Sequence, residues 1–169
     1  MGAGKTTIGQ LVSQSLGYRF VDTDAVIEQA TDQSISQIFA QLGEPEFRQM
    51  ETQVLSELST YTKLVVATGG GIVSQRQNWS YLQQGVVIWL NVPLDVLYQR
   101  LKHSSDRPLL QTDDLQAKLQ LLLQERRQLY AQADLEVEVN AGETAGQVAA
   151  RVVEKLPTVL RSDASQPEA

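Results

Sequence analysis

Residues 64–71 read LVVATGGG, a short apolar run rich in valine that ends in three consecutive glycines. A second run of this kind, VVIWLN, occupies residues 86–91. Continuous apolar runs of this length are typical of strands that are covered on both faces of a parallel sheet. Glycine favours neither helix nor strand, so the triple glycine predicts a loop after the first run. Such a loop either lets a ligand approach the backbone closely or is simply flexible.

The rest of the chain continues the pattern outward from these two runs. Strand-like stretches at residues 18–22 and 135–140 flank them, and helical stretches fill the intervals. We expect the helices at residues 5–16, 23–31, 34–42, 45–61, 75–83, 93–102, 114–132 and 143–159. Strands that alternate with helices in this way predict an α/β fold with a mostly parallel sheet.

Length and composition restrict the class of protein. A chain of 169 residues predicts one domain, which we place at residues 1–160, with a polar tail at residues 161–169. A net charge of −6 argues against a nucleic-acid-binding protein, which would carry a basic surface. No apolar run approaches the ~20 residues that cross a bilayer, and no signal peptide is visible. The chain has no cysteine for disulfides or thiol chemistry, and we expect a cytoplasmic monomer.

Ligands of parallel α/β sheets bind at the carboxyl ends of the strands, so the residues after each strand are candidates for the site. Here these are DTD at residues 22–24 and GGG at residues 69–71. The third strand is followed by a helix and then by HSSDRPLL at residues 103–110. The fold would place all three segments on one rim.

The sequence GAGKTT at residues 2–7 matches the end of the phosphate-binding pattern G-x-x-x-x-G-K-[ST]. Backbone N–H groups of such a loop bind phosphate oxygens at the start of a helix, Lys5 would reach the β- and γ-phosphates, and Thr6 would bind Mg²⁺. A fragment this short also matches by chance. The amphipathic helix that follows it favours the nucleotide site.

Two carboxylates, Asp22 and Asp24, stand at the end of the first strand. Next to a phosphate-binding loop, such a pair can serve Mg²⁺ and a substrate hydroxyl. The alternative for Asp24 is a structural role as the N-cap of the next helix.

Two arginines lie close to apolar helix faces. Arg48 is three residues before Glu51, a spacing that allows an ion pair within the helix, or an arginine held in place for a substrate carboxylate. Arg126 shares a face with Leu119 and Leu122. An unpaired buried guanidinium is very unfavourable, so Arg126 either has an anion as its partner or extends to solvent. The polar stretch around Arg107 predicts a loop, and an arginine on a closing lid can stabilise a phosphoryl group in transfer.

Taken together, GAGKTT, YRFVDTD, GE..FR..E, VVATGGG, RPLL and R..LY resemble the shikimate kinase family from Gly2 to about Leu160. The combination is specific, whereas no single piece is. The resemblance implies a P-loop NTPase-type three-layer αβα fold with a mobile lid at about residues 103–114. It also implies transfer of the γ-phosphoryl of ATP to the 3-hydroxyl of shikimate, with Mg²⁺, in the pathway to chorismate and the aromatic amino acids.

The resemblance also implies a role for each matching residue. The phosphate loop comprises Gly2, Ala3, Gly4, Lys5, Thr6 and Thr7. Thr6 and Asp22 match the metal site, and Asp24 matches the residue that binds the shikimate hydroxyls and acts as base. Arg48 and Arg126 match the pair that binds the shikimate carboxylate. The glycines Gly69, Gly70 and Gly71 match the loop over the shikimate ring. Arg107 matches the lid arginine that meets the phosphates, with Lys5 and Asp24 as its catalytic partners, and Arg100 is placed near the adenine.

In this family a further strand precedes the phosphate loop, at the centre of a five-stranded sheet in the order 2-3-1-4-5, and this sequence shows only the other four. Without that strand, backbone groups would stay unpaired at ~1–3 kcal/mol each, a large share of the ~5–15 kcal/mol that stabilises a domain. We therefore expect either that the natural chain starts upstream of Met1 or that this form is weak or inactive. The first is favoured because every other catalytic position is intact.

Two alternative functions compete with this one. Another small-molecule kinase of the P-loop group, such as gluconokinase, would share the phosphate loop, but the two arginines and the triple glycine argue against it. A non-catalytic relative would keep the fold, but such proteins usually lose a lysine, aspartate or arginine of the site. A nucleic-acid partner has no support, because the sequence shows no basic stripe.

Overall fold

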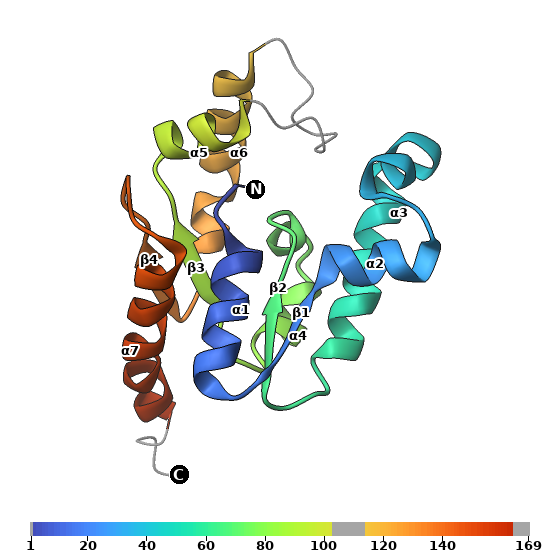
Figure 1. The fold of residues 1–169 in the computed structure, drawn as a ribbon. Coiled ribbons are helices and arrows are strands. Elements are labelled where there is room, and N and C mark those ends of the chain that lie inside the picture. Colours follow the sequence, from blue (N-terminus) through green and yellow to red (C-terminus); the bar gives the residue numbers. More distant parts are fainter. Residues whose placement is uncertain (1, 103–113, 164–169) are drawn as a thin grey trace.

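The computed structural model describes residues 2–102 and 114–163, with side chains up to residue 160 (Figure 1). Helices alternate with short strands along the chain, as the sequence predicts. In order, the elements are α1 Lys5–Leu16, β1 Arg19–Asp22, α2 Thr23–Thr31, α3 Ile35–Leu58, β2 Leu64–Ala67, η1 Ile72–Ser74, α4 Asn78–Leu82, β3 Ile88–Asn91, α5 Leu94–Leu101, α6 Leu115–Tyr130, β4 Leu135–Glu138 and α7 Ala145–Asp163. None of these helices combines the length and hydropathy needed to span a bilayer.

All four predicted strands are confirmed, and they form two parallel pairs. β1 pairs with β2, with Arg19 opposite Leu64, and β3 pairs with β4, with Ile88 opposite Leu135. Within the described residues no strand lies between β2 and β3. The two pairs therefore contain the four strands that the sequence predicts.

The two helical stretches predicted at 34–42 and 45–61 are found as two segments of α3, which meet at a kink at Gly43 with a φ of 82° and a ψ of 174°. Glycine adopts this positive φ without the steric penalty of a side chain, and Pro45 resumes the helix just beyond it. The helix predicted at 75–83 is shorter and spans only α4, because residues 75–77 form a bend and a turn after η1.

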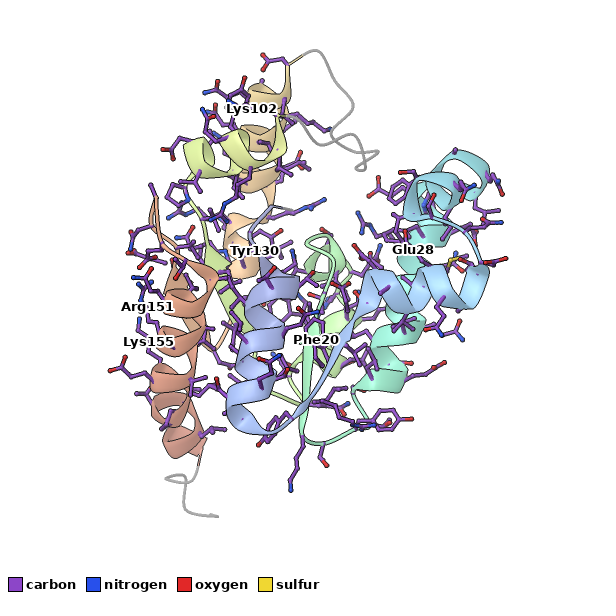
Figure 2. The ribbon with its side chains drawn as sticks, viewed as in Figure 1. Phe20, Glu28, Lys102, Tyr130, Arg151 and Lys155 are labelled. Atoms are coloured by element: carbon purple, nitrogen blue, oxygen red, sulfur yellow. The ribbon has the colours of Figure 1, made fainter. Side chains whose placement is uncertain are left out.

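The helices cover the strands from both sides. α1 packs against β1, β2 and α7, and α7 also covers β4 (Figure 1). Gly9 of α1 lies so close to Phe20 of β1 that a Cβ there would stand 2.7 Å from the ring (Figure 2). η1 contacts α3, α4 and α6, which pack around it as a second group. This arrangement holds the carboxyl ends of the strands near the start of α1.

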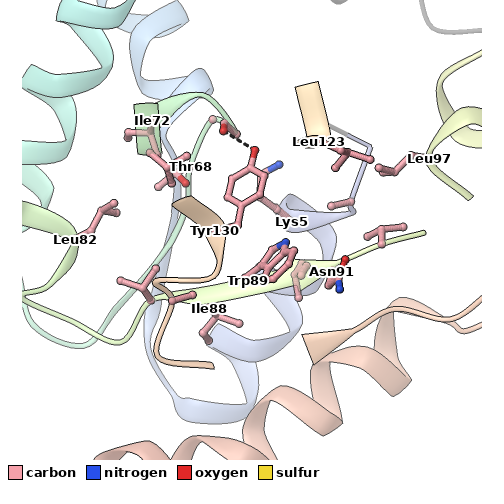
Figure 3. A pocket seen from close by; sticks show the side chains of 18 of the residues that line it. Lys5, Thr68, Ile72, Leu82, Ile88, Trp89, Asn91, Leu97, Leu123 and Tyr130 are labelled. Carbon is pink, nitrogen blue, oxygen red and sulfur yellow. Dashed lines mark hydrogen bonds between the residues drawn. The ribbon is translucent and has the colours of Figure 1, made fainter. Parts of the chain in front are cut away.

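A cavity that we call the central hollow lies between β3 and the segment that follows β2 (Figure 3). It has a volume of about 120 Å³ and is lined by Thr68 and Gly69 beyond β2 and by all of β3. The expectation that both apolar runs are fully covered is not met, because all four residues of β3 and three of the four residues of β2 are only half-buried. The physical reason is that this edge of β3 has no neighbouring strand among the described residues.

Candidate active site

The phosphate loop, residues 2–7, makes the turn into α1. Gly2 and Gly4 have φ values of 68° and 83°, a left-handed conformation that residues with a side chain rarely adopt. Gly4 caps α1 without a side chain, and the first N–H groups of a helix have no carbonyl partner within it. Together with the positive end of the helix dipole, these N–H groups are suited to bind a phosphate.

Arg100 of α5 lies against the phosphate loop. Its Nη1 donates a hydrogen bond to the carbonyl of Gly2 at 3.1 Å, across 98 positions of sequence. A cavity of about 200 Å³ is lined by Arg100, by Gly2 and Thr7 of the loop, and by Val148 of α7. The structure therefore brings Arg100 to the side of the loop where a bound nucleotide could extend.

Thr6 and Asp22, the predicted metal ligands, lie in direct contact. The Thr6 hydroxyl donates to Oδ2 of Asp22 at 2.6 Å. The other oxygen of Asp22 accepts the backbone N–H of Asp24 at 3.0 Å and caps α2. The alternative role of Asp24 as N-cap is therefore wrong, because the cap is Asp22 and Asp24 belongs to the first turn.

The oxygen pair of Thr6 and Asp22 is of the kind that Mg²⁺ prefers, and Mg²⁺ usually takes only one or two protein ligands and completes its shell with water and phosphate. The described residues hold no cluster of three or more acidic or histidine side chains that could bind a metal alone. The two residues therefore fit a metal that arrives with a nucleotide.

Arg48 forms a buried ion pair with Glu51 one turn along α3. Nη1 of Arg48 contacts Oε2 of Glu51, while its Nη2 donates to Oε1 of Glu44 at 2.8 Å. Arg48 is 8% exposed and Glu51 is 0% exposed. We call the three residues Glu44, Arg48 and Glu51 the ion-paired floor. Pairing from both sides fixes the guanidinium, as an arginine aimed at a substrate requires.

The glycine loop, residues 69–71, lies directly on the ion-paired floor. A Cβ on Gly69 would overlap Oε1 of Glu51, and a Cβ on Gly71 would lie 2.5 Å from the guanidinium of Arg48. The N–H of Gly69 donates to the buried hydroxyl of Thr23 at 3.3 Å. A side chain at either glycine would therefore displace Glu51 or Arg48.

Asp24 and Arg126 also lie near this floor. Burial raises the pKa of Glu51, and the charge of Asp24 raises it further, against the lowering effects of Arg48 and Arg126. Burial by itself would lower the pKa of Arg48, but the carboxylates of Glu51 and Glu44 outweigh it and raise that pKa. Two arginines, one aspartate and the glycine loop thus come together from α2, α3, β2 and α6.

Some predicted site residues are not described by the structure, and some residues that contact the site were not predicted. Arg107 and residues 103–113 of the predicted lid lie outside the described residues. Glu44 could have been predicted, because it precedes Arg48 by one helical turn. The contacts of Thr23 and Tyr130 with the glycine loop span 46 and 60 positions, and no local pattern indicates them.

The geometry offers two anion sites on one rim. The phosphate loop suits a phosphate chain, and Arg48 and Arg126 suit a carboxylate, with the Asp24 carboxylate near the second site. An enzyme that transfers a phosphoryl group between a nucleotide and a small acid needs this arrangement, because the chemistry depends on positioning and charge neutralisation.

Comparisons with known proteins agree with this geometry. The family model of shikimate kinase matches residues 1–157. A shikimate kinase of Nostoc sp. (strain PCC 7120) is 56% identical over 165 residues, which cover 98% of this chain and 91% of the relative. That of Thermosynechococcus vestitus is 56% identical over 161 residues, covering 95% and 88% of the two chains.

Solved structures point the same way. A shikimate kinase from Acinetobacter baumannii, in complex with shikimate, superposes with a TM-score of 0.86 at 39% identity, covering 98% of this chain and 91% of that one. A gluconokinase from Sinorhizobium meliloti reaches a TM-score of 0.60 at 14% identity, covering 99% and 93%, which is a likeness of fold alone. The chain therefore belongs to the shikimate kinase family and is an ATP-dependent phosphotransferase that acts on an alcohol.

Proposed function

We propose that the described residues bind ATP and shikimate side by side and transfer the γ-phosphoryl to the 3-hydroxyl of shikimate. The observation that carries this proposal is the ion-paired floor under the glycine loop, with Asp24 and Arg126 beside it. The relative from Acinetobacter baumannii is described with shikimate bound, which supports the same ligand here.

The phosphate loop would hold the nucleotide. Its N–H groups at the start of α1 would bind the phosphate oxygens, and Lys5 would neutralise charge between the β- and γ-phosphates. Ala3 and Thr7 complete the loop, and Arg100 would lie beside the nucleotide at the adenine side. The contact of Arg100 with the Gly2 carbonyl supports this position.

Thr6 and Asp22 would hold Mg²⁺ through one hydroxyl and one carboxylate oxygen. When bound, the ion would neutralise charge on the β- and γ-phosphates. Asp22 also caps α2 through the N–H of Asp24, so the same carboxylate would keep Asp24 in place.

The acid substrate would lie on the glycine loop with its carboxylate between Arg48 and Arg126. A planar guanidinium binds a carboxylate with two parallel hydrogen bonds, so the pair would fix both the position and the orientation of the ring. Asp24 would then accept hydrogen bonds from the ring hydroxyls and take the proton of the attacking one. Gly69, Gly70 and Gly71 would let the ring approach the backbone, because glycine has no side chain.

Three further statements stay predictions of the sequence. Arg107 as a lid arginine lies outside the described residues. The cytoplasm as location and the monomer as the oligomeric state are the other two.

The first experiment measures ADP release by the 169-residue chain with Mg-ATP, with shikimate, with gluconate and with neither. Shikimate-dependent release supports the proposal. Release that depends on gluconate would instead support the alternative kinase. If the protein is folded and neither acid stimulates ADP release, the result would favour the non-catalytic relative.

The second experiment compares Arg126→Ala with Arg127→Ala, its exposed neighbour on the same helix. We expect Arg126→Ala to abolish shikimate binding, measured by calorimetry, while ATP binding stays within about twofold, because one of the two carboxylate ligands is lost. Arg127→Ala should bind both ligands normally. Equal loss of both ligands in Arg126→Ala would mean that Arg126 has a structural role.

A further inference from the structure

Tyr130, the last residue of α6, connects two parts of the molecule that no described strand joins. Its hydroxyl donates a hydrogen bond to the carbonyl oxygen of Gly70 at 2.7 Å (Figure 3). Gly70 follows β2, whereas α6 leads into β4, the partner of β3. The bond therefore crosses the mouth of the central hollow, between the two strand pairs.

The ring of Tyr130 is itself held by β3. It stacks on the ring of Trp89, with centroids 5.9 Å apart and an angle of 29° between the planes. Both rings line the central hollow and lie next to each other there (Figure 3). Stacked aromatic pairs favour a defined geometry. The Tyr130 hydroxyl consequently has a fixed position relative to β3.

The glycine loop is a segment that needs such an anchor. Successive glycines have more backbone freedom than any other residues, so local sequence does not fix their conformation. Glu51 and Arg48 confine Gly69 and Gly71 from one side. The bond from Tyr130 to Gly70 holds the loop from α6, a different element.

The same helix carries Arg126, four residues before Tyr130. Residues at this spacing lie on one face of a helix, one turn apart. Arg126 is close enough to Glu51 to lower the pKa of that carboxyl. α6 thus presents a guanidinium and a hydroxyl to the same part of the site.

We propose that Tyr130 is a positioning residue for the acid substrate. Its hydroxyl fixes the glycine loop relative to Arg126, so that the ring and the carboxylate of the substrate are engaged together. This inference rests on the proposed function of the site, which it extends by one residue. Tyr130 would act only through Gly70.

The test compares Tyr130→Phe with Tyr81→Phe. The first substitution keeps the ring and its stacking on Trp89 but removes the hydroxyl. Tyr81 of α4 is also half-buried, packs on the same apolar cluster and makes no hydrogen bond to the glycine loop, so it controls for the loss of a tyrosine hydroxyl. KM for shikimate, KM for ATP, the melting temperature and the hydrogen exchange of the amides of residues 69–72 are measured for each.

For Tyr130→Phe we expect KM for shikimate to rise about three- to tenfold, the effect of one hydrogen bond, while KM for ATP changes less than twofold. Amide exchange in the glycine loop should accelerate. Tyr81→Phe should leave all of these values unchanged. A lower melting temperature with an unchanged KM for shikimate would overturn the proposal, because it would show a purely structural role.

Hydrogen exchange separates this inference from the function on which it rests. If the wild-type chain shows no shikimate-dependent ADP release, the proposed function fails, and exchange still tests the anchor. Unchanged loop exchange in Tyr130→Phe overturns the role of Tyr130 whatever the activity.

Discussion

The ion-paired floor and the central hollow lie on either side of the glycine loop, and they are packed in opposite ways. On the floor side, Glu51 is fully buried and no space remains for a Cβ at Gly69 or Gly71. On the other side, a cavity of about 120 Å³ remains and β3 is only half-buried.

The difference shows that the ion-paired floor and the strand residues around the hollow depend on different kinds of packing partner. The floor is built from residues of one helix at spacings of three and four, and a loop that directly follows β2 covers it. Apolar strand residues have no such local partner, because a strand is covered only when its neighbours and the helices on its faces are in place. The ion pairs of the floor therefore depend on residues close together in the sequence, whereas the packing around β3 depends on elements far apart in the sequence.

We expect the largest effect from a substitution that removes the ion pairs of the floor. Arg48→Ala leaves the buried carboxylate of Glu51 without its cation and should destabilise the fold by about 3–5 kcal/mol. Urea denaturation at pH 7.5 measures this loss. The double variant Arg48→Ala/Glu51→Gln removes the unpaired charge and should be less destabilised than the single variant. A double variant that is less stable than the single one would contradict this account.

The Arg48→Ala variant also carries a pH dependence of known sign. Burial raises the pKa of Glu51 above 4.5, and loss of Arg48 removes a lowering effect. The folded state then binds the Glu51 proton more tightly than the unfolded state does, so stability falls as pH rises above about 4.5. Arg48→Ala should be more stable at pH 5 than at pH 7.5, and the double variant should lack this difference.

The second prediction concerns an extension of the chain that would fill the central hollow. Five apolar β-branched residues joined ahead of Met1 should be able to enter the gap between β2 and β3, because Ala3 and Lys5 lie at its edge. Pairing with both strand edges should add about 2–4 kcal/mol, at roughly 1 kcal/mol for each net hydrogen bond. A Gly/Ser extension of equal length is the control. Equal melting temperatures for the two extended chains would show that the gap does not accept a strand.

The third prediction tests the contact between loop and floor. Gly69→Ala should cost about 1–3 kcal/mol, because its Cβ would overlap the Glu51 carboxylate, which the helix holds in place. It should also raise KM for shikimate, because the loop must move. Gly85→Ala is a matched control, since nothing lies within 4 Å of a Cβ there. Similar melting temperatures for the two variants would argue against close packing.

The smallest effect concerns a half-buried counterpart of the buried pair. Glu143 contacts Arg151 of α7 and accepts the N–H of Asn140, and these bonds lower the pKa of Glu143 to about 2 (Figure 2). The stability it contributes is fully present above pH 4.5 and is lost as pH falls toward 2. Glu143→Gln should flatten the acid side of the stability curve and change little at pH 7. An unchanged acid slope would show that the pair contributes nothing.

The site was predictable to the extent that its contacts are local. The ion pair of Arg48 with Glu51 follows from their spacing, and the glycines after Ala67 mark a loop at the end of a strand. The alternative in which Asp24 caps α2 is wrong, because the helix starts at Thr23 and a difference of two residues in the helix start decides between Asp22 and Asp24.

The sequence by itself determined the four strands, the helices between them and the residues on the rim. Each of these depends on interactions between residues a few positions apart, which hydrophobic periodicity and turn residues encode. Only the tertiary structure decided that Gly71 lies on Arg48 and that Tyr130 reaches Gly70. These contacts join segments 23 to 60 positions apart, and no single segment contains the partner that creates them.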